Sequence, residues 1–269
     1  MKLINKIIQK FLLILLFASL LTFIYSEIRK DYLPSQAGIL EQIYTVPEQI
    51  AVKDEGFEIK REGTTYEITP KYSYELYGLI VSAYDTDIWY DITHANDPLN
   101  TKDICVIWGE NIKSGVYQKM KYRSGEFTCF FEFKPGTDSV WYDKFDGTSL
   151  SNNHLLPETE TLSKLIKSSN IGDQIHLKGL LIDYSIKTQD GTIGTRDTST
   201  VRTDTGCEII YTTDFEILKK GNESYHTLNL VSKYAILTSF VALVLLSLFQ
   251  NNNHSTTHEQ LINTKSTMN

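Results

Sequence analysis

Two long apolar runs, one at each end of the chain, constrain this protein more than any other feature of its sequence. The first is FLLILLFASLLTFIY, residues 11–25, and three lysines precede it. The second is YAILTSFVALVLLSLF, residues 234–249, and it carries no charge. Such runs are typical of signal sequences and of helices that cross a membrane, so the chain is predicted to meet a bilayer at both ends.

The first run has two interpretations. A basic segment followed by an apolar run is the pattern of a cleaved secretory signal or of a signal anchor. The uncharged part is shorter than the roughly 20 residues of a comfortable span, which favours cleavage, although Ile4, Ile7 and Ile8 could extend it. Ile24-Tyr25-Ser26 matches a small-x-small cleavage site poorly, which favours an uncleaved anchor over residues 1–26.

The second run fits one crossing of a hydrocarbon core about 30 Å thick, over residues 228–250, with Lys233 able to reach the interface. The alternative is a buried core helix, but a helix that is apolar on every face has few places to bury itself in a modest domain. Residues 251–269 are polar and predict a disordered tail. Residues 27–56 are predicted to be a linker, and residues 57–227 the folded domain.

Orientation follows from the basic residues. Lys2, Lys6 and Lys10 precede the first run, and the positive-inside bias predicts that this end stays in the cytoplasm. The central domain is then extracytoplasmic, and the second span returns the tail to the cytoplasm. Three other lysines lie just before or within the second span and favour the opposite sense: Lys219, Lys220 and Lys233.

The centre of the chain predicts one mainly β domain. FEIKREGTTYEIT has two strand-like pieces around Arg61-Glu62-Gly63, which is the pattern of a hairpin. Residues 109–125 predict a long, turn-rich connection. Further strands are predicted in YSYELYGLIVSAY, DICVIW, EFTCFFEF, GDQIHLKGLLIDYS and GCEIIYTTDFEIL.

One short helix is predicted in LPETETLSKLIKSSNIGD. Pro157 suits its first turn, and the apolar residues after it recur at helical spacing. Asn170 and Gly172 are typical of a helix end.

IGDQIHLKGLLIDY, residues 171–184, resembles strands of the small oligomer-binding (OB) barrels. It has a Gly-Asp turn, an alternating strand and a glycine before an apolar continuation, and residues 207–218 would supply a later strand. The resemblance implies an OB-like barrel that binds a ligand along one face. It carries no catalytic residue over to this chain.

The three cysteines have no C-x-x-C spacing, so a structural zinc site has little support. Strand alternation places Cys129 on the face of Phe127 and Phe131, and places Cys105 and Cys207 on apolar faces. Each can be a small buried residue, or Cys105 and Cys129 can form a disulfide in an oxidising compartment. A catalytic thiol is disfavoured because no basic group adjoins any of them.

The most site-like cluster is WYDITHANDPLN. Asp91 and Asp97 could orient the imidazole of His94 or bind a cation, and Trp89 and Tyr90 could stack on a sugar or another flat group. The alternative is a loop whose Asn, Asp and Pro residues only make turns.

A second unusual segment is KTQDGTIGTRDTSTVRTDTG. Arg196 and Arg202 could contact an anion or a glycan, or the segment is a long hairpin arm that turns at Asp190-Gly191. We find no phosphate-binding glycine loop and no histidine pair with metal-ligand spacing, so no cofactor and no metal are predicted. The net charge of −7 disfavours nucleic acid as a partner.

These features predict a membrane-anchored binding or scaffolding module of the cell envelope or secretory system. Its partners are the bilayer and a membrane or envelope protein. No catalytic site is evident. The alternative is a membrane-anchored hydrolase that uses Asp91, His94 and Asp97, with or without the help of a metal.

Overall fold

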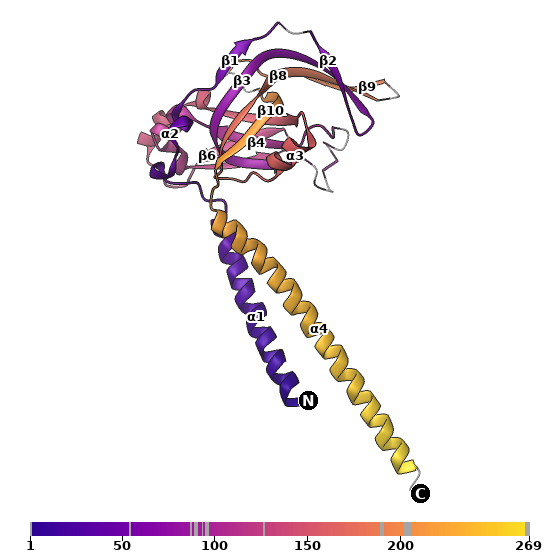
Figure 1. The fold of residues 1–269 in the computed structure, drawn as a ribbon. Coiled ribbons are helices and arrows are strands. Elements are labelled where there is room, and N and C mark those ends of the chain that lie inside the picture. The colour runs from indigo at the N-terminus through magenta and orange to yellow at the C-terminus, as the bar shows by residue number, and fades with distance from the viewer. Residues whose placement is uncertain are drawn as a thin grey trace. The chain divides into compact units, whose positions relative to one another are not determined.

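A computed structural model of the chain describes residues 2–53, 55–86, 88, 91–92, 94, 97–125, 127–188, 191–201 and 206–266. The chain forms two compact units (Figure 1). One is the sheet-rich stretch Asp31–Gly221, and the other combines Met1–Lys30 with Asn222–Asn269. All the described strands lie in the sheet-rich unit, which confirms the β-rich part of the predicted fold.

The second unit is a pair of helices, α1 (Lys2–Arg29) and α4 (Glu223–Ser266). They run antiparallel, so the free ends of α1 and α4 point the same way (Figure 1). Leu3–Arg29 and Glu223–Phe249 are long and apolar enough to cross a membrane, and only 6% and 11% of their apolar windows are buried. Helix α4 continues to Ser266, where the sequence predicts a disordered tail.

Small polar side chains line the contact between α1 and α4. The Asn229 amide donates to Glu27 Oε2 over 2.8 Å and to Ser26 Oγ over 3.2 Å. Ser19 and Ser239 are also buried. Small residues that let backbones approach, with a few polar groups hydrogen-bonded between helices, are typical of helices that associate in lipid.

In the sheet-rich unit five strands close into a ring. β3 pairs with β4, β4 with β7, β7 with β10, β10 with β8, and β8 returns to β3. Only the β7–β10 pair is parallel. The ring strands are β3 (Thr64–Asp85), β4 (Lys102–Ile107), β7 (Leu150–Pro157), β8 (Gln174–Thr188) and β10 (Glu208–Lys219). Shorter strands extend its edges: β1 (Glu48–Ala51) and β2 (Phe57–Arg61) on β3, and β9 (Gly191–Arg196) on β8.

Strand β3 is long enough to pair with both β8 and β4 along its length. Its 22 residues pair with β8 from Thr65 to Leu79 and with β4 from Leu79 to Asp85. A register shift between Pro70 and Tyr72 bends it, where proline supplies no ladder N–H. The ring encloses a core of fully buried aliphatic side chains, among them Leu76, Ile80, Val106, Leu177 and Ile210.

A separate hairpin, β5 (Met120–Gly125) and β6 (Thr128–Phe133), packs beside the ring. It follows the short helix α2 (Gly109–Lys113) in the stretch predicted as a connection, so the sequence reading missed a strand there. A disulfide joins Cys129 of β6 to Cys105 of β4, with an Sγ–Sγ distance of 2.05 Å and a Cα–Cα distance of 5.9 Å. The bond therefore staples the hairpin to a fully buried ring strand.

The predicted hairpin at Arg61-Glu62-Gly63 is confirmed. Arg61 of β2 pairs with Thr64 of β3, and both turn residues have positive φ, 48° for Glu62 and 83° for Gly63. Two left-handed residues in a two-residue loop match the twist of the flanking strands.

Helix α3 (Glu160–Lys167) confirms the predicted short helix but begins later than expected. Its N-cap is Thr159, whose hydroxyl accepts from the Leu162 N–H over 3.2 Å. Pro157 instead ends β7, where it pairs with Thr212 of β10. The sequence reading missed β7 because Asn152, Asn153 and His154 make its first half polar.

The residues predicted as a linker belong to the sheet-rich unit from Asp31 onward. Ile43 is fully buried in an apolar cluster with Leu79 and Val81. The Gln174 amide group also accepts from the Leu40 N–H over 2.7 Å and donates to the Gly38 carbonyl over 2.8 Å. This segment is therefore packed against the ring and is not a separate linker.

One close backbone contact in the ring gives a test of the fold. A Cβ at Gly179 of β8 would lie 2.3 Å from the Tyr211 carbonyl oxygen of β10. We expect Gly179→Ala to push these strands apart and lower the free energy of unfolding by about 1–3 kcal/mol. Urea unfolding of the full chain in detergent measures this. Gly147→Ala, where a Cβ would meet nothing within 4 Å, is the control, and equal losses in both variants would contradict the ring.

Candidate functional site

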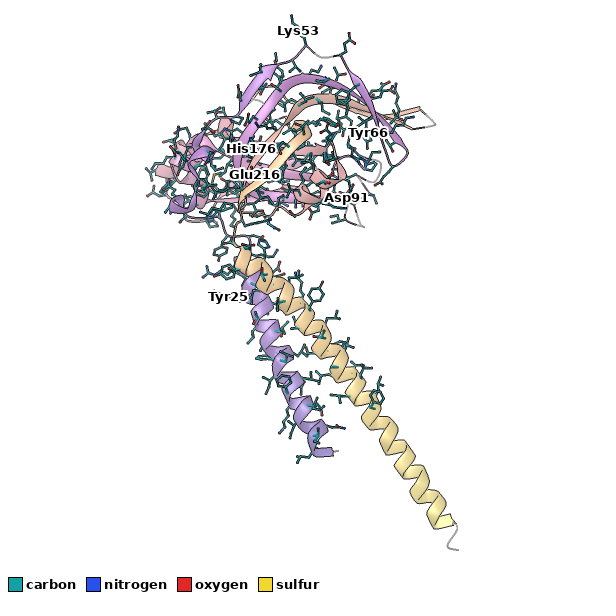
Figure 2. All side chains as sticks on the ribbon, in the orientation of Figure 1. Tyr25, Lys53, Tyr66, Asp91, His176 and Glu216 are labelled. Carbon is teal, nitrogen blue, oxygen red and sulfur yellow. A yellow bond between two sulfur atoms is a disulfide. The ribbon has the colours of Figure 1, made fainter. Side chains whose placement is uncertain are left out.

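Three connections that are far apart in the sequence meet at one end of the ring. Asp97 comes from the β3–β4 connection, Phe127 from the β5–β6 turn and Arg196 from the end of β9. The Arg196 guanidinium lies 4.6 Å from the centre of the Phe127 ring, and its Nη1 lies 4.0 Å from Asp97 Oδ2. In Figure 2, Tyr66 and Asp91 both lie toward this end of the domain, whereas His176 lies away from it. We call these residues and their neighbours the loop site.

His94 and Asp91 form a buried pair in the β3–β4 connection. His94 Nδ1 lies 2.6 Å from Asp91 Oδ2, and the His94 backbone N–H donates to Asp91 Oδ1 over 3.0 Å. Burial alone would raise the pKa of Asp91, but these hydrogen bonds outweigh it and hold that pKa below its usual value. The carboxylate therefore stays ionised and fixes the orientation of the imidazole.

A second histidine and carboxylate continue this array. His154 Nδ1 lies 2.6 Å from Asp103 Oδ1, and Asp103 Oδ2 lies 3.9 Å from His94 Nε2. Asn100 also donates to Asp103 over 3.2 Å. Both histidines and Asp103 are almost completely buried. The result is a row of alternating acids and imidazoles, Asp91, His94, Asp103 and His154.

The sequence analysis singled out neither Asp103 nor His154. The two residues meet because β4 and β7 are antiparallel and place Asp103 directly opposite His154. Cross-strand register of this kind is non-local, so only a correct strand assignment for β7 could have revealed it.

The carboxylate of Asp97 pairs with two tyrosines and not with the imidazole of His94. Its carboxylate accepts from Tyr66 on β3 over 3.0 Å and from Tyr184 on β8 over 2.5 Å. Burial, followed by the negative charge of Asp97, raises the pKa of both tyrosines, so both remain donors. Tyr66 also accepts from the Leu99 N–H over 3.1 Å. Asp97 thus clamps the β3–β4 connection to two ring strands.

Phe127 covers the histidines. The sequence places it on a strand face, but in the structure it is a turn residue with φ 57°. Its ring centre lies 4.3 Å from that of His94 and 6.0 Å from that of His154. The Cys207 thiol donates to the Phe127 carbonyl over 3.1 Å, and burial raises the pKa of that thiol. Cys207 therefore stays protonated and is a poor nucleophile.

A polar pocket of about 420 Å³ opens beside His94 and Asp97. The β2–β3 turn, the β3–β4 connection and α3 contribute to its wall. Its charged and hydroxyl-bearing lining residues include Arg61, Glu62, Thr86, Glu160, Ser163 and Lys167. Trp89, Tyr90 and Arg202, predicted to contact a ligand, lie outside the described residues.

The chemistry of this arrangement is that of an oriented imidazole without an assembled nucleophile. Among the described residues, His94 Nε2 has no hydrogen-bond partner, and no three acidic, histidine or cysteine side chains are grouped to hold a metal ion. No protein-family model, no curated protein and no solved structure matches this chain. Function is therefore inferred from the geometry alone.

His176 is not part of the loop site and is only 8% exposed. It pairs with Glu75 Oε1 over 2.8 Å and stacks on Tyr77 with ring centres 4.3 Å apart. Adjacent strands β3 and β8 bring these partners together across the ladder.

The lowered pKa of Asp91 predicts how stability changes with pH. A carboxylate whose pKa is lower in the folded state stabilises the fold above its unfolded pKa, about 3.9, and loses this contribution as pH falls through the folded value. We expect Asp91→Asn to lower the free energy of unfolding most at pH 6–7, with the difference from wild type shrinking below about pH 4. Urea unfolding at a series of pH values measures it. The exposed Asp214→Asn serves as control, and a constant Asp91→Asn deficit down to pH 2 would contradict the assignment.

Proposed function

We propose that this chain is a membrane-tethered binding module of the cell envelope or secretory system. Two apolar helices at its ends hold the β domain close to a bilayer, with both termini cytoplasmic and the domain extracytoplasmic. The Cys105–Cys129 disulfide supports this side, because disulfides persist in oxidising compartments and are rare in the cytosol. A domain tethered twice suits contact with a membrane protein or an envelope polymer.

The proposal includes an OB-like barrel. Numbered by their order in the chain, the five ring strands follow one another as 1-2-3-5-4 and close back on 1, with the third and fifth parallel. Helix α3 lies in the chain between the third and fourth ring strands, β7 and β8. A five-stranded Greek-key barrel of this kind binds its ligands on one face and through the loops between strands 1 and 2 and strands 4 and 5.

The meeting of Asp97, Phe127 and Arg196 is the observation that carries the binding function. Asp97 lies in the connection between ring strands 1 and 2, and Arg196 in the arm between ring strands 4 and 5. These are the two loops that an OB-like barrel uses for binding. The net charge of −7 disfavours a nucleic-acid ligand and leaves a protein or a neutral or cationic polymer.

Site-specific photo-crosslinking tests this proposal. Ile92, in the β3–β4 connection, is 85% exposed, and Ile50, on β1, is 54% exposed and serves as a matched apolar control. We expect a photoreactive residue at position 92 to give a discrete adduct in native membranes, and the same residue at position 50 to give none. Arg196→Ala should weaken the adduct at position 92. Equal crosslinking at both positions, or at neither, would contradict a binding role for this loop.

The predicted compartment is tested through the thiols. Intact cells are quenched in acid, and free thiols are then alkylated at neutral pH under denaturing conditions. Disulfides are afterwards reduced and alkylated with a second reagent. We expect the second label on Cys105 and Cys129 and the first label on Cys207, because only the first two are bonded. The first label on all three would place the domain in a reducing compartment.

A hydrolase remains the second candidate because the buried Asp91–His94 pair resembles the orienting half of a catalytic array. His94→Ala separates the two functions. Loss of a hydrolytic activity with an unchanged crosslink from position 92 would favour catalysis, whereas loss of the crosslink alone would favour binding.

A further inference from the structure

A groove of about 650 Å³ lies on the sheet-rich unit, apart from the loop site. One wall is the segment that begins the unit, Asp31, Tyr32 and Leu33. The other is strand β5 with Met120, Lys121 and Tyr122. Ile171, in the turn between α3 and β8, closes one end. None of these residues takes part in the site described above.

The floor of the groove is apolar. Val81 and Met120 are only 3% and 2% exposed, and Leu33 and Tyr122 are half-buried above them. Tyr122 turns its hydroxyl inward to Met120 Sδ, 3.5 Å away, so it presents little polarity to the groove. The lining holds four apolar side chains, Leu33, Val81, Met120 and Ile171, beside polar and charged ones that include Gln118, Lys121 and Lys134. The hollow is therefore suited to a ligand with both an apolar chain and a polar or charged group.

The chain itself keeps the groove near the end of α1. Tyr32 is three residues after Arg29, the last residue of α1, and three residues reach at most about 11 Å. This limit holds whichever way the domain is turned. If α1 crosses the membrane, Tyr32 therefore stays within about 11 Å of the end of that helix.

The connection to α4 limits the distance to a helix in the same way at the Ile171 end of the groove. Gly172 follows Ile171, and its backbone touches that of Gly221 so closely that a Cβ on Gly221 would lie 2.3 Å from Gly172 C. The Gly221 N–H also donates to Asp173 over 2.7 Å. Gly221 precedes the first residue of α4, Glu223, by only two positions. Both ends of the groove are thus tied by short chain lengths to apolar helices.

Two exposed lysines stand at the rim. Lys121 makes only a long 3.8 Å ion pair with Glu132, and Lys134 donates to the Gln118 carbonyl over 2.8 Å. Asp31 is the carboxylate that lines the groove with them. Among the residues that line the groove, two are lysines and one is a carboxylate, while Glu132 pairs with Lys121 from outside the lining. This surplus of lysines in the lining favours an anionic group at the mouth.

We infer that this groove binds one acyl chain of an anionic membrane lipid, with the lipid headgroup held between Lys121 and Lys134. The inference rests on the membrane tether of the proposed function. The apolar lining residues take the chain, the lysines take the charge, and the short connections keep the groove within a few residues of both α1 and α4.

The test uses the full chain reconstituted in phosphatidylcholine vesicles. The vesicles contain a small fraction of a photoactivatable lipid with a diazirine in its acyl chain, either phosphatidylglycerol or phosphatidylcholine. We expect the anionic probe to label peptides that contain Tyr32 or Met120–Tyr122 roughly tenfold more than the zwitterionic probe does, the effect of two lysines near an anionic headgroup. Mass spectrometry of the labelled peptides gives the ratio.

Charge variants identify the headgroup contacts. Lys121→Gln with Lys134→Gln should bring the labelling ratio close to one while leaving the fold intact, since both residues are exposed. Lys113→Gln with Lys164→Gln, which removes two exposed lysines elsewhere, should leave the ratio unchanged.

Flotation of the vesicles separates the two possible failures. A protein that floats but shows equal labelling by both probes, or labelling confined to α1 and α4, would overturn the lipid site and leave the membrane tether standing. A protein that does not float would overturn the tether, and the lipid site with it.

Discussion

The pairing of β3 with β8 is the constraint on which the rest of the domain depends. It runs from Thr65 opposite Lys187 to Leu79 opposite Gln174, and it is the longest ladder in the described chain. Strand β4 pairs with the far end of β3, and β10 pairs with the other edge of β8. The β3–β8 ladder therefore sets the register of every other ring strand. A slip of one residue would turn the buried side chains of both strands outward.

The same ladder positions the loop site. It brings Tyr66 and Tyr184, which are more than a hundred positions apart in the chain, to a ring-centre distance of 6.0 Å. Their hydroxyls then hold Asp97, and with it the β3–β4 connection that carries Asp91 and His94. The Cys105–Cys129 bond performs a similar task for the β5–β6 turn, since Phe127 is two residues from Cys129. Long-range contacts therefore fix the position of the connections that carry these polar side chains.

The contrast between local and long-range contacts explains what could be read from the sequence. The Arg61-Glu62-Gly63 turn, helix α3 and the pairing of His94 with Asp91 three residues away all depend on neighbours in the chain, and their patterns are visible there. The pairing of Asp97 with two distant tyrosines, in place of His94, is not visible in the sequence, because no local pattern predicts it. Strand β7 was missed for a related reason. Its buried Asn153 donates to the Ile104 carbonyl of β4 and its buried His154 lies against the Asp103 carboxylate of β4, and composition does not show such contacts.

The parallel pairing of β7 with β10 has a consequence for how the domain is made. β10 fits between β7 and β8, yet it is the last strand in the chain and α4 follows almost at once. The ring cannot close until β10 has been synthesised, so β7 and β8 each keep an open edge while the chain emerges. Closure then depends on contacts of large sequence separation, which form slowly. Synthesis of α4 therefore follows closely on completion of the ring, and a chain interrupted before residue 208 would carry unpaired strand edges.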